Sequence, residues 1–428
     1  MLAVLRQRNF ALLWTAGLIS LTGNWMLYVA LPLTVYELTG SALATSGIFV
    51  AYRATGVALG SVAGVFVDRW DRRRTMVAAN LVQGVVLLPL LLVDSPGRVW
   101  LVYVVAVAVT VGGVFFQPAE NALLPRLVGD EHLVVANSLN ALNNNLARLI
   151  GPPLGGGVVA LAGLRGAALA DAVSFGLAAA LIAGIAASGR PAPAGARAAP
   201  DVGGAWRRFW REWGRGLSAI RRDRVLSVVF GLAAVMSLGE GVFGVLIVVF
   251  TAEVLGGGAA ELGWLMAGQA VGGLIGAALL ASSRRVLPPA RLLGWGAVAL
   301  GVIDLLIFNY PAFVPGIALG LALFVVVGVP ATAIGTGVTT LLQTTTDDAH
   351  RGRVFGALGT TSGLTFIVSA LAAGGLSERL GVVPVLNVQG IAYIVAGLAG
   401  LAFLRGGTVA VGAARPVRGV APPAGGTS

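Results

Sequence analysis

The amino-acid sequence predicts an all-α integral membrane protein of twelve transmembrane helices, arranged as two pseudo-symmetric six-helix bundles. Two observations lead to this fold class. Of the 428 residues, 57% are hydrophobic and only 11% are charged, with a mean hydropathy of +0.88, whereas soluble domains carry about 25% charged residues. The apolar residues also fall into runs of roughly 20, the length that crosses the hydrocarbon core of a bilayer. A soluble enzyme and a disordered chain are therefore excluded.

Twelve apolar runs follow one another along the chain. Each is expected to be an α-helix, because a backbone exposed to lipid must satisfy its own hydrogen bonds. The first run is too long for a cleaved signal peptide. The predicted spans are residues 10–36, 43–67, 74–93, 98–120, 136–161, 166–188, 225–252, 260–281, 290–308, 313–342, 353–376 and 381–404.

The placement of arginine predicts the orientation in the membrane. All 29 basic residues are arginine, and most lie in loops on one side of the spans: the N-terminus, the loop after the second span, and residues 189–224. The positive-inside rule places these loops and both termini in the cytoplasm. The arginine, alanine and glycine bias is typical of a GC-rich bacterial genome, so we expect a multi-pass protein of the bacterial cytoplasmic membrane.

Residues 189–224 divide the spans six and six. This predicts an N-terminal bundle at 1–188, a C-terminal bundle at 225–404 and a disordered cytoplasmic tail at 405–428. The linker opens with a proline- and alanine-rich stretch and continues with aromatic residues on one helical face, among them Trp206, Trp210 and Trp213. Such a helix would lie in the lipid interface. A plain interdomain linker explains the segment about as well.

The two halves show weak internal similarity. A shift of 212 residues superposes Gly64 on Gly276, and Arg72-Arg73 on Arg284-Arg285. Transporters often retain such traces of duplication.

Three sets of residues carry a resemblance to a known family. The segment from Gly64 to Arg74 resembles the signature G-x-x-x-D-R-x-G-R-R of the major facilitator superfamily, with Asp71 where glycine is usual. Residues 151–156, Gly-Pro-Pro-Leu-Gly-Gly, are similar to the G-P-x-x-G-G element of its efflux members, although Ala147 replaces a glycine of that signature. Residues 35–41, 117–125 and 171–175 resemble the bacterial macrolide-efflux and enterobactin-exporter subgroup.

The resemblance implies a drug:proton antiporter with the major facilitator fold. Its expected activity is proton-coupled efflux of a small hydrophobic molecule, such as an antibiotic, drug or siderophore, by alternating access. An uptake carrier or a lipid-translocating carrier of the same fold remains open. An integral-membrane enzyme is a third alternative, against which stands the lack of a nucleophile–base or metal constellation in the sequence.

The first candidate site is a cytoplasmic gate in the signature loop. Asp68 at the end of a helix opposes the helix dipole, so it should seek a cation or a helix N-terminus. Arg72, Arg353 or the start of the eleventh span could supply this partner. The resemblance implies that this contact latches the two halves together. Simple anchoring by the arginines is the alternative. The predicted gate residues are Gly64, Asp68, Arg69, Arg72 and Arg73.

The second candidate is a seam in the fifth span, formed by Gly151, Pro152, Gly155 and Gly156. Small residues allow helices to approach closely, and proline bends the span. A flexible seam between the halves and plain tight packing explain these residues equally well.

The third candidate is a set of ionisable residues at membrane depth, where charge is costly and often functional. Arg53, Arg148 and Glu240 fall near the middle of their spans. The resemblance implies that the seventh span lines the cavity, which makes Glu240 the leading proton- or cation-binding carboxylate. The two arginines would be its ion partners or would neutralise an anionic substrate. A static buried pair is the alternative.

Four further polar residues complete the candidate set. Asp171 and Asp304 lie on spans that the resemblance makes peripheral, so they are expected to be structural. Asn24 occupies a position where the subgroup often has aspartate, and an amide cannot carry a proton. Glu120 is expected to face the cytoplasmic vestibule or Arg126.

No cofactor or metal is expected. The chain has no cysteine, and its two histidines, His132 and His350, fall in predicted loops. Without lysine there is no P-loop for ATP, so the proton gradient is the expected energy source. The expected partners are a small-molecule substrate and the lipid bilayer, with no nucleic acid, and the protein is expected to be monomeric.

Overall fold

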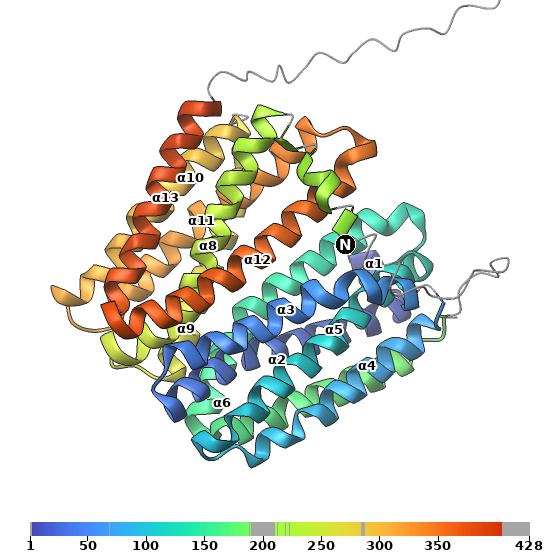
Figure 1. Cartoon of the computed structure of the whole chain (residues 1–428). Coiled ribbons are helices and arrows are strands. Elements are labelled where there is room, and N and C mark those ends of the chain that lie inside the picture. Colours follow the sequence, from blue (N-terminus) through green and yellow to red (C-terminus); the bar gives the residue numbers. More distant parts are fainter. Residues whose placement is uncertain are drawn as a thin grey trace, which may run out of the picture.

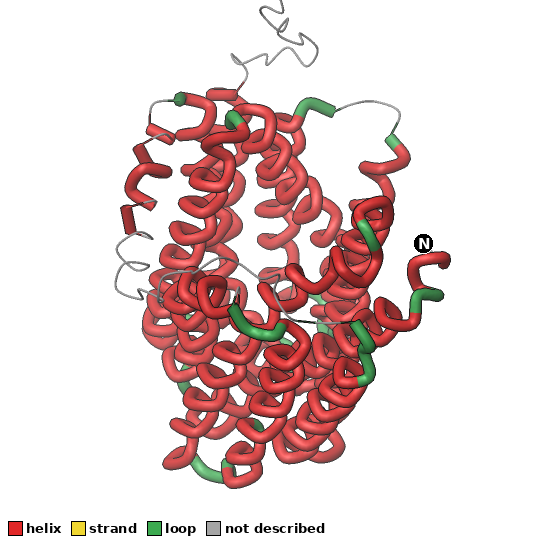
Figure 2. Tube along the Cα trace, turned by 90° about the vertical axis from the view of Figure 1, so that its right-hand side faces the viewer, coloured by secondary structure: helices red, strands yellow, loops and turns green. Residues whose placement is uncertain are grey.

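The computed structural model describes residues 2–404 except for 68, 188, 190–209, 212, 219, 222 and 284–286. Within this part of the chain every regular element is a helix, as Figure 2 shows. The predicted tail, Asp68, Trp206, Arg284 and Arg285 lie outside the described residues.

The described residues of the N-terminal half form five helices of 15 residues or more, one short helix and several single turns. Short 3₁₀ turns at Leu88–Leu92, Pro96–Arg98 and Asp130–His132 connect them. The helices are α1 (Leu2–Leu5), α2 (Arg8–Thr39), α3 (Ala42–Val67), α4 (Arg72–Val86), α5 (Val99–Val128) and α6 (Leu133–Ala183).

The described residues of the C-terminal half form six α-helices. The first of them is continued by a π-helical turn at Phe250–Val254, and a 3₁₀ turn at Tyr310–Ala312 follows the third. The helices are α8 (Arg224–Val249), α9 (Ala259–Ser282), α10 (Pro289–Asn309), α11 (Ala318–Thr345), α12 (Asp348–Leu380) and α13 (Val382–Leu404).

The predicted twelve spans are confirmed once α6 is read as two. Among the described residues, 11 continuous helical segments are long and apolar enough to cross a membrane. One of them contains α6, whose 51 residues are interrupted at Gly163 with φ 64° and ψ −167°. Side chains with a Cβ rarely adopt this backbone conformation, so glycine permits the chain to reverse here. The parts before and after Gly163 correspond to the fifth and sixth predicted spans.

Local sequence features explain where the helix of the third span begins and ends. Asp71 caps the first turn of α4, because its Oδ1 accepts a 3.0 Å hydrogen bond from the backbone N–H of Arg74. This capping role gives a physical reason for aspartate where the family signature has glycine. The helix ends at Val86, just before the 3₁₀ turn that contains Pro89, so the predicted span at 74–93 comprises a helix and this turn.

The two halves lie side by side and meet along two helix pairs. Figure 1 shows α3 against α12 at the centre of the view, and α6 packs on α9 in the same way. Glycines allow the backbones to come close: a Cβ on Gly374 of α12 would lie 2.8 Å from the Cα of Leu43, and one on Gly156 of α6 would collide with the carbonyl oxygen of Ala259. We call the helix ends around Ser41, Ala259 and Glu378 the closed face, and the opposite side the open face.

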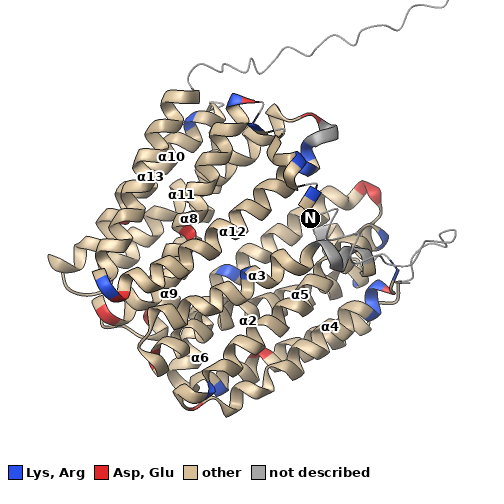
Figure 3. Cartoon of the chain, viewed as in Figure 1, with Lys and Arg blue, Asp and Glu red and all other residues tan. Residues whose placement is uncertain are grey.

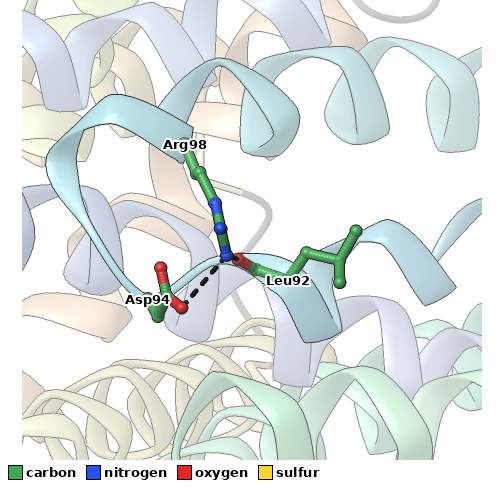
Figure 4. Close-up of polar contacts among 3 residues, drawn as sticks. All are labelled: Leu92, Asp94 and Arg98. Atoms are coloured by element: carbon green, nitrogen blue, oxygen red, sulfur yellow. Dashed lines mark hydrogen bonds and ion pairs between the residues drawn. The ribbon is translucent and has the colours of Figure 1, made fainter.

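Charged residues concentrate near the ends of the helices, and the ribbon between them is largely uncharged (Figure 3). One such pair lies in the loop before α5 on the closed face. Figure 4 shows Arg98 donating to Asp94 Oδ2 at 3.0 Å and to the carbonyl oxygen of Leu92 at 2.9 Å. The charge of Arg98 is thereby compensated.

The described part of the linker packs on protein. Trp213 Nε1 donates to Thr361 Oγ1 of α12 at 3.3 Å, and Ile220 is only 3% exposed within the core of the C-terminal half. Part of the aromatic face that was expected to lie on lipid therefore contacts α12.

Candidate functional site

The structure brings the three mid-depth charges together between the halves. Arg53 on α3 and Arg148 on α6 come from the N-terminal half, and Glu240 on α8 comes from the C-terminal half. All three side chains are exposed although each lies in the middle of a helix. Both guanidinium groups attract the Glu240 carboxylate electrostatically, yet neither forms a direct ion pair with it among the described residues. We call these three residues the central site.

The two arginines are held by contacts other than ion pairs. The guanidinium of Arg53 lies 4.6 Å from the centre of the Phe366 ring on α12. That of Arg148 lies 5.6 Å from the Trp25 ring, and its Nη2 donates to Gln269 Oε1 of α9 at 3.1 Å. Two of these contacts, to Phe366 and Gln269, join the two halves. Cation–π contacts and neutral acceptors hold the arginines in place while leaving their charge uncompensated.

Glu240 is positioned by the glycines on either side of it. A Cβ on Gly239 would collide with the hydroxyl of Tyr393 on α13, and one on Gly241 would collide with Ser369 Oγ on α12. The Tyr393 hydroxyl in turn donates to the carbonyl oxygen of Met236 at 3.1 Å. α8 is therefore packed closely between α12 and α13 at this level, which fixes the backbone from which Glu240 projects.

Aromatic rings of α2, α3 and α12 surround the central site. Tyr28 stacks on Tyr52 at 6.2 Å and makes edge contacts with Trp25 at 5.2 Å and with Phe49 at 5.7 Å. Phe49 reaches Phe366 in the other half at 6.4 Å. Tyr28 is also within electrostatic range of all three charged residues of the central site. The surroundings thus combine apolar ring surface with three charges.

Two neighbouring cavities lie within the N-terminal half. One, of about 400 Å³, is bordered by apolar residues of α2, α3 and α5. The other, of about 200 Å³, is bordered by asparagine and glutamine side chains and by Glu120. Asn24, Gln83, Gly113 and Gln117 border both. Glu120 faces this cavity and accepts from amides of Gln117 and Asn140, each at 3.4 Å.

Asp171 and Asp304 are buried, and each is hydrogen-bonded within its own half. Asp171 is fully buried and accepts a 2.7 Å hydrogen bond from Ser174, in a space that Gly23 of α2 leaves open. Asp304 is 4% exposed and accepts from Gln389 Nε2 on α13 at 3.2 Å. Each contact lies within one half, which is the arrangement that a structural role requires.

The gate residues are only partly described. Asp68 lies outside the described residues, so its partner is not defined. Arg72 Nη1 donates to the carbonyl oxygen of Ala122 at 3.1 Å, and Arg73 Nη1 donates to that of Ile185 at 2.5 Å. Gly64 lies in the last turns of α3 and Arg69 in the turn that follows. These contacts tie the loop to α5 and to the segment that follows α6, both in its own half.

The small residues of the fifth span face two different neighbours. A Cβ on Gly151 would lie 2.8 Å from the carbonyl oxygen of Thr22, and one on Gly155 would lie 2.7 Å from the Cα of Met26, so both face α2 in the same half. Gly156 faces Ala259 of α9, and Pro152 meets Gly263 of α9. One side of this span thus packs on α2 within its own half, and the other side packs on α9 of the other half.

The closed face carries hydrogen bonds between the halves. Glu378 of α12 accepts from the Ser41 hydroxyl at 2.7 Å and from the Leu43 N–H at 3.2 Å. The Tyr36 hydroxyl of α2 donates to the carboxylate of Glu253, in the π turn after α8. Tyr36 and Ser41 lie in the 35–41 stretch that resembles the efflux subgroup, although no role was predicted for them. The sequence motifs did not indicate Glu253, Glu378, Gln269 or Phe366.

Two six-span halves that enclose exposed charges at mid-depth define a membrane transporter. The profile of the Major Facilitator Superfamily matches residues 13–238. The chain therefore belongs to the Major Facilitator Superfamily, as the sequence motifs predicted.

Relatives with assigned names include efflux proteins. The chain is 26% identical to YfiS, an uncharacterized MFS-type transporter of Bacillus subtilis (strain 168), over 92% of each chain. It is 27% identical to the multidrug efflux pump Tap of Mycolicibacterium fortuitum, over 86% of this chain and 88% of Tap. Macrolide efflux protein A of Streptococcus pyogenes is 29% identical over 34% of this chain and 36% of its own. These matches confirm the resemblance to macrolide-efflux proteins.

A solved structure shares the fold. A POT family transporter, crystallised with a thioalcohol-conjugated peptide, superposes with a TM-score of 0.72 at 12% identity, over 92% of this chain and 96% of that chain. At this identity the likeness concerns the fold alone. The predicted fold class, two helical bundles of the major facilitator type, is confirmed.

Proposed function

We propose that this chain exports a small hydrophobic molecule from a bacterial cytoplasm by alternating access, in exchange for protons. It would act as a monomer without a cofactor. The observation that carries the proposal is the exposed carboxylate of Glu240, which faces two arginines of the opposite half without a direct ion pair.

The placement of these charges supplies a coupling mechanism. Glu240 belongs to the C-terminal half, whereas Arg53 and Arg148 belong to the N-terminal half. Any rocking of one half against the other changes the distances between them, and Coulombic energy depends directly on distance. The proton affinity of Glu240 therefore changes with the access state. A carboxylate that binds a proton in one state and releases it in the other links the proton gradient to the cycle.

The direction of transport follows from orientation and from the relatives. The arginine-rich loops lie on the open face, so the positive-inside rule places that face and both termini in the cytoplasm. The contacts around Ser41 and Glu378 then close the periplasmic or outer side. Tap and macrolide efflux protein A, by their names, move compounds outward. Together these points favour export over uptake.

The apolar surroundings of the central site favour a hydrophobic substrate. Five aromatic rings lie around the three charged residues: Trp25, Tyr28, Phe49, Tyr52 and Phe366. The larger cavity is bordered by the apolar residues Leu27, Leu31, Val109 and Val114. Ligand sites of this kind take most of their affinity from apolar contact and their orientation from a few polar groups. A macrolide antibiotic, the compound class named for one relative, is therefore the first substrate to test.

Transport into proteoliposomes tests the proposal. Vesicles with the open face outward, an acidic lumen and a radiolabelled macrolide outside should accumulate the drug above its external concentration. Nigericin, which dissipates the pH difference, should abolish accumulation, and protein-free vesicles correct for passive trapping of a weak base. Accumulation only with an alkaline lumen would identify proton symport from the cytoplasmic side, and accumulation that ignores nigericin would refute proton coupling.

A further inference from the structure

Two helices of the C-terminal half present apolar faces on its outer surface. The exposed residues of α10 and of α13 recur at helical spacing, so each helix has one continuous exposed face. These residues are Trp295, Val302 and Leu306 of α10, and Ile391, Val395 and Leu398 of α13. Both helices are long and apolar enough to span the membrane, so we call these faces the lipid-facing stripes.

The end of α13 at the open face is flanked by two other helices. A Cβ on Gly294, near the start of α10, would lie 2.5 Å from Leu401 Cγ of α13. On another side of α13, a Cβ on Gly400 would lie 2.8 Å from Leu232 Cδ1 of α8. Because both contacts lie within two turns of the end of α13, the starts of α8 and α10 lie on either side of this end.

Each of these two helix starts carries an exposed arginine. Arg291 lies one turn before Trp295, so it continues the stripe of α10 to the open face. Arg224 is the first residue of α8, and its guanidinium lies 5.9 Å from the centre of the Phe403 ring. Phe403 is 55% exposed at the end of α13. Each arginine thus has an exposed aromatic neighbour at the level where a transmembrane helix leaves the hydrocarbon for the headgroups.

The charges of Arg224 and Arg291 are not compensated within the described part of the chain, where neither forms an ion pair. Asp223 precedes Arg224, but its Oδ1 caps α8 by accepting the backbone N–H of Leu226 at 3.0 Å. The one acid of α10 is Asp304, more than three turns beyond Arg291, and α13 contains no acid. A negatively charged ligand would therefore complement this surface.

We propose that an anionic phospholipid of the cytoplasmic leaflet binds at the end of α13. Its phosphate contacts Arg224 and Arg291, and its acyl chains lie along the lipid-facing stripes. The guanidinium fork matches the geometry of a phosphate, and basic groups on the cytoplasmic side attract anionic headgroups. A zwitterionic lipid carries its own ammonium beside the phosphate, so it gains less from two arginines. The site does not depend on the substrate or on the coupling ion of the proposed function.

Fluorescence quenching in proteoliposomes tests the site on the full-length protein. The chain has no native cysteine, so Leu398→Cys places a single bimane label on the stripe of α13. Brominated phosphatidylglycerol and brominated phosphatidylcholine are compared as minor components of phosphatidylcholine vesicles, because bromine quenches only a nearby label. One arginine favours an anionic lipid roughly fivefold, so phosphatidylglycerol should be preferred at least fivefold at low salt. A preference below twofold would overturn the proposal.

Matched controls separate this site from general attraction to anionic lipid. A label at Val388, 67% exposed on the same face of α13 near the closed face, should report a preference below twofold. Replacing Arg224 and Arg291 together by glutamine should lower the preference at Leu398→Cys below twofold, whereas lysine at both positions should retain most of it. Arg165→Gln, at an exposed arginine of the closed face, should change nothing. Equal preference at the two labels, or a preference that survives the double glutamine variant, would refute the site.

Discussion

The carboxylate of Glu378 accepts a 2.7 Å hydrogen bond from the hydroxyl of Ser41, so α12 of one half caps the start of α3 in the other. The same carboxylate oxygen accepts from the backbone N–H of Leu43 at 3.2 Å. A negative charge at a helix N-terminus is stabilised by the helix dipole. Because the partners belong to different halves, this contact has to break whenever the closed face opens.

Replacing Glu378 by glutamine should loosen the closed face. The neutral amide keeps the shape but loses the charge, and with it part of the roughly 1.5–3 kcal/mol of a charge-assisted hydrogen bond. We expect the population open at this face to rise on the order of fivefold. Spin labels at Leu161 and Phe313, which are 91% and 83% exposed, would report the distance between halves, and the absence of native cysteine permits clean labelling.

Asp94→Asn is the matched control for this measurement. It removes an acid from the same face, but its partner Arg98 belongs to the same half (Figure 4). It should leave the label distances unchanged. An unchanged distribution in Glu378→Gln, or an equal shift in Asp94→Asn, would exclude a latch at Glu378.

The sequence predicted the fold because bilayer thickness imposes the length of every span. It also located Arg53, Arg148 and Glu240, since a charge at mid-depth stands out against an apolar background. It could not identify Gln269 or Phe366 as their contacts. An uncharged glutamine or phenylalanine in a span costs far less free energy in the membrane than a charged residue, so it does not stand out in the sequence. Which helix faces contact one another also depends on how the two halves pack.

The Ser41–Glu378 contact was beyond sequence reasoning for a related reason. The two residues are 337 positions apart, and both lie where polar residues at helix ends are common. The sequence likewise did not distinguish whether the glycines of the fifth span form a seam between the halves or pack within one half. Gly155 and Gly156 are adjacent in sequence, yet one faces α2 within its half and the other faces α9 across the interface.

Asp304 should prove structural. Asp304→Asn keeps a carbonyl oxygen for Gln389 Nε2, so transport should stay within about twofold and stability should change little. Asp304→Ala removes the acceptor and leaves Gln389 buried without it, which should destabilise the protein by about 1–3 kcal/mol. Thermal unfolding in detergent measures the difference. Loss of transport in a stable Asp304→Asn variant would instead give α10 a direct part in coupling.

Adjacent glycines of α6 offer a test of the contact between halves. A Cβ on Gly156 collides with the carbonyl oxygen of Ala259, whereas one on Gly157 meets nothing within 4 Å. Gly156→Ala should therefore separate α6 from α9, at a cost of about 1–3 kcal/mol for overpacking. It should also widen the Leu161–Phe313 distance. Gly157→Ala should be neutral or stabilise the helix by up to about 1 kcal/mol. Equal behaviour of the two variants would mean that α6 and α9 are not in close contact.

Glu240 is the most informative single position. It is exposed at mid-depth, electrostatically coupled to Arg53 and Arg148, and held on a backbone that Gly239 and Gly241 pack against α13 and α12. The structure thus gives it a closely packed backbone and charged neighbours that belong to the other half. Its removal should affect coupling more than binding.

Glu240→Gln keeps the size of the side chain but removes the titratable group. In proteoliposomes this variant should retain substrate binding and should exchange substrate at equilibrium at a rate close to that of the parent. Accumulation under an imposed pH gradient should fall by at least tenfold, because no proton is then carried through the cycle. Asp304→Asn serves as the comparison, since it removes a carboxyl group of the same half that is buried and hydrogen-bonded to Gln389. If Glu240→Gln accumulates substrate like the parent while Asp304→Asn does not, the proton is carried on α10 and the coupling assigned to the central site is wrong.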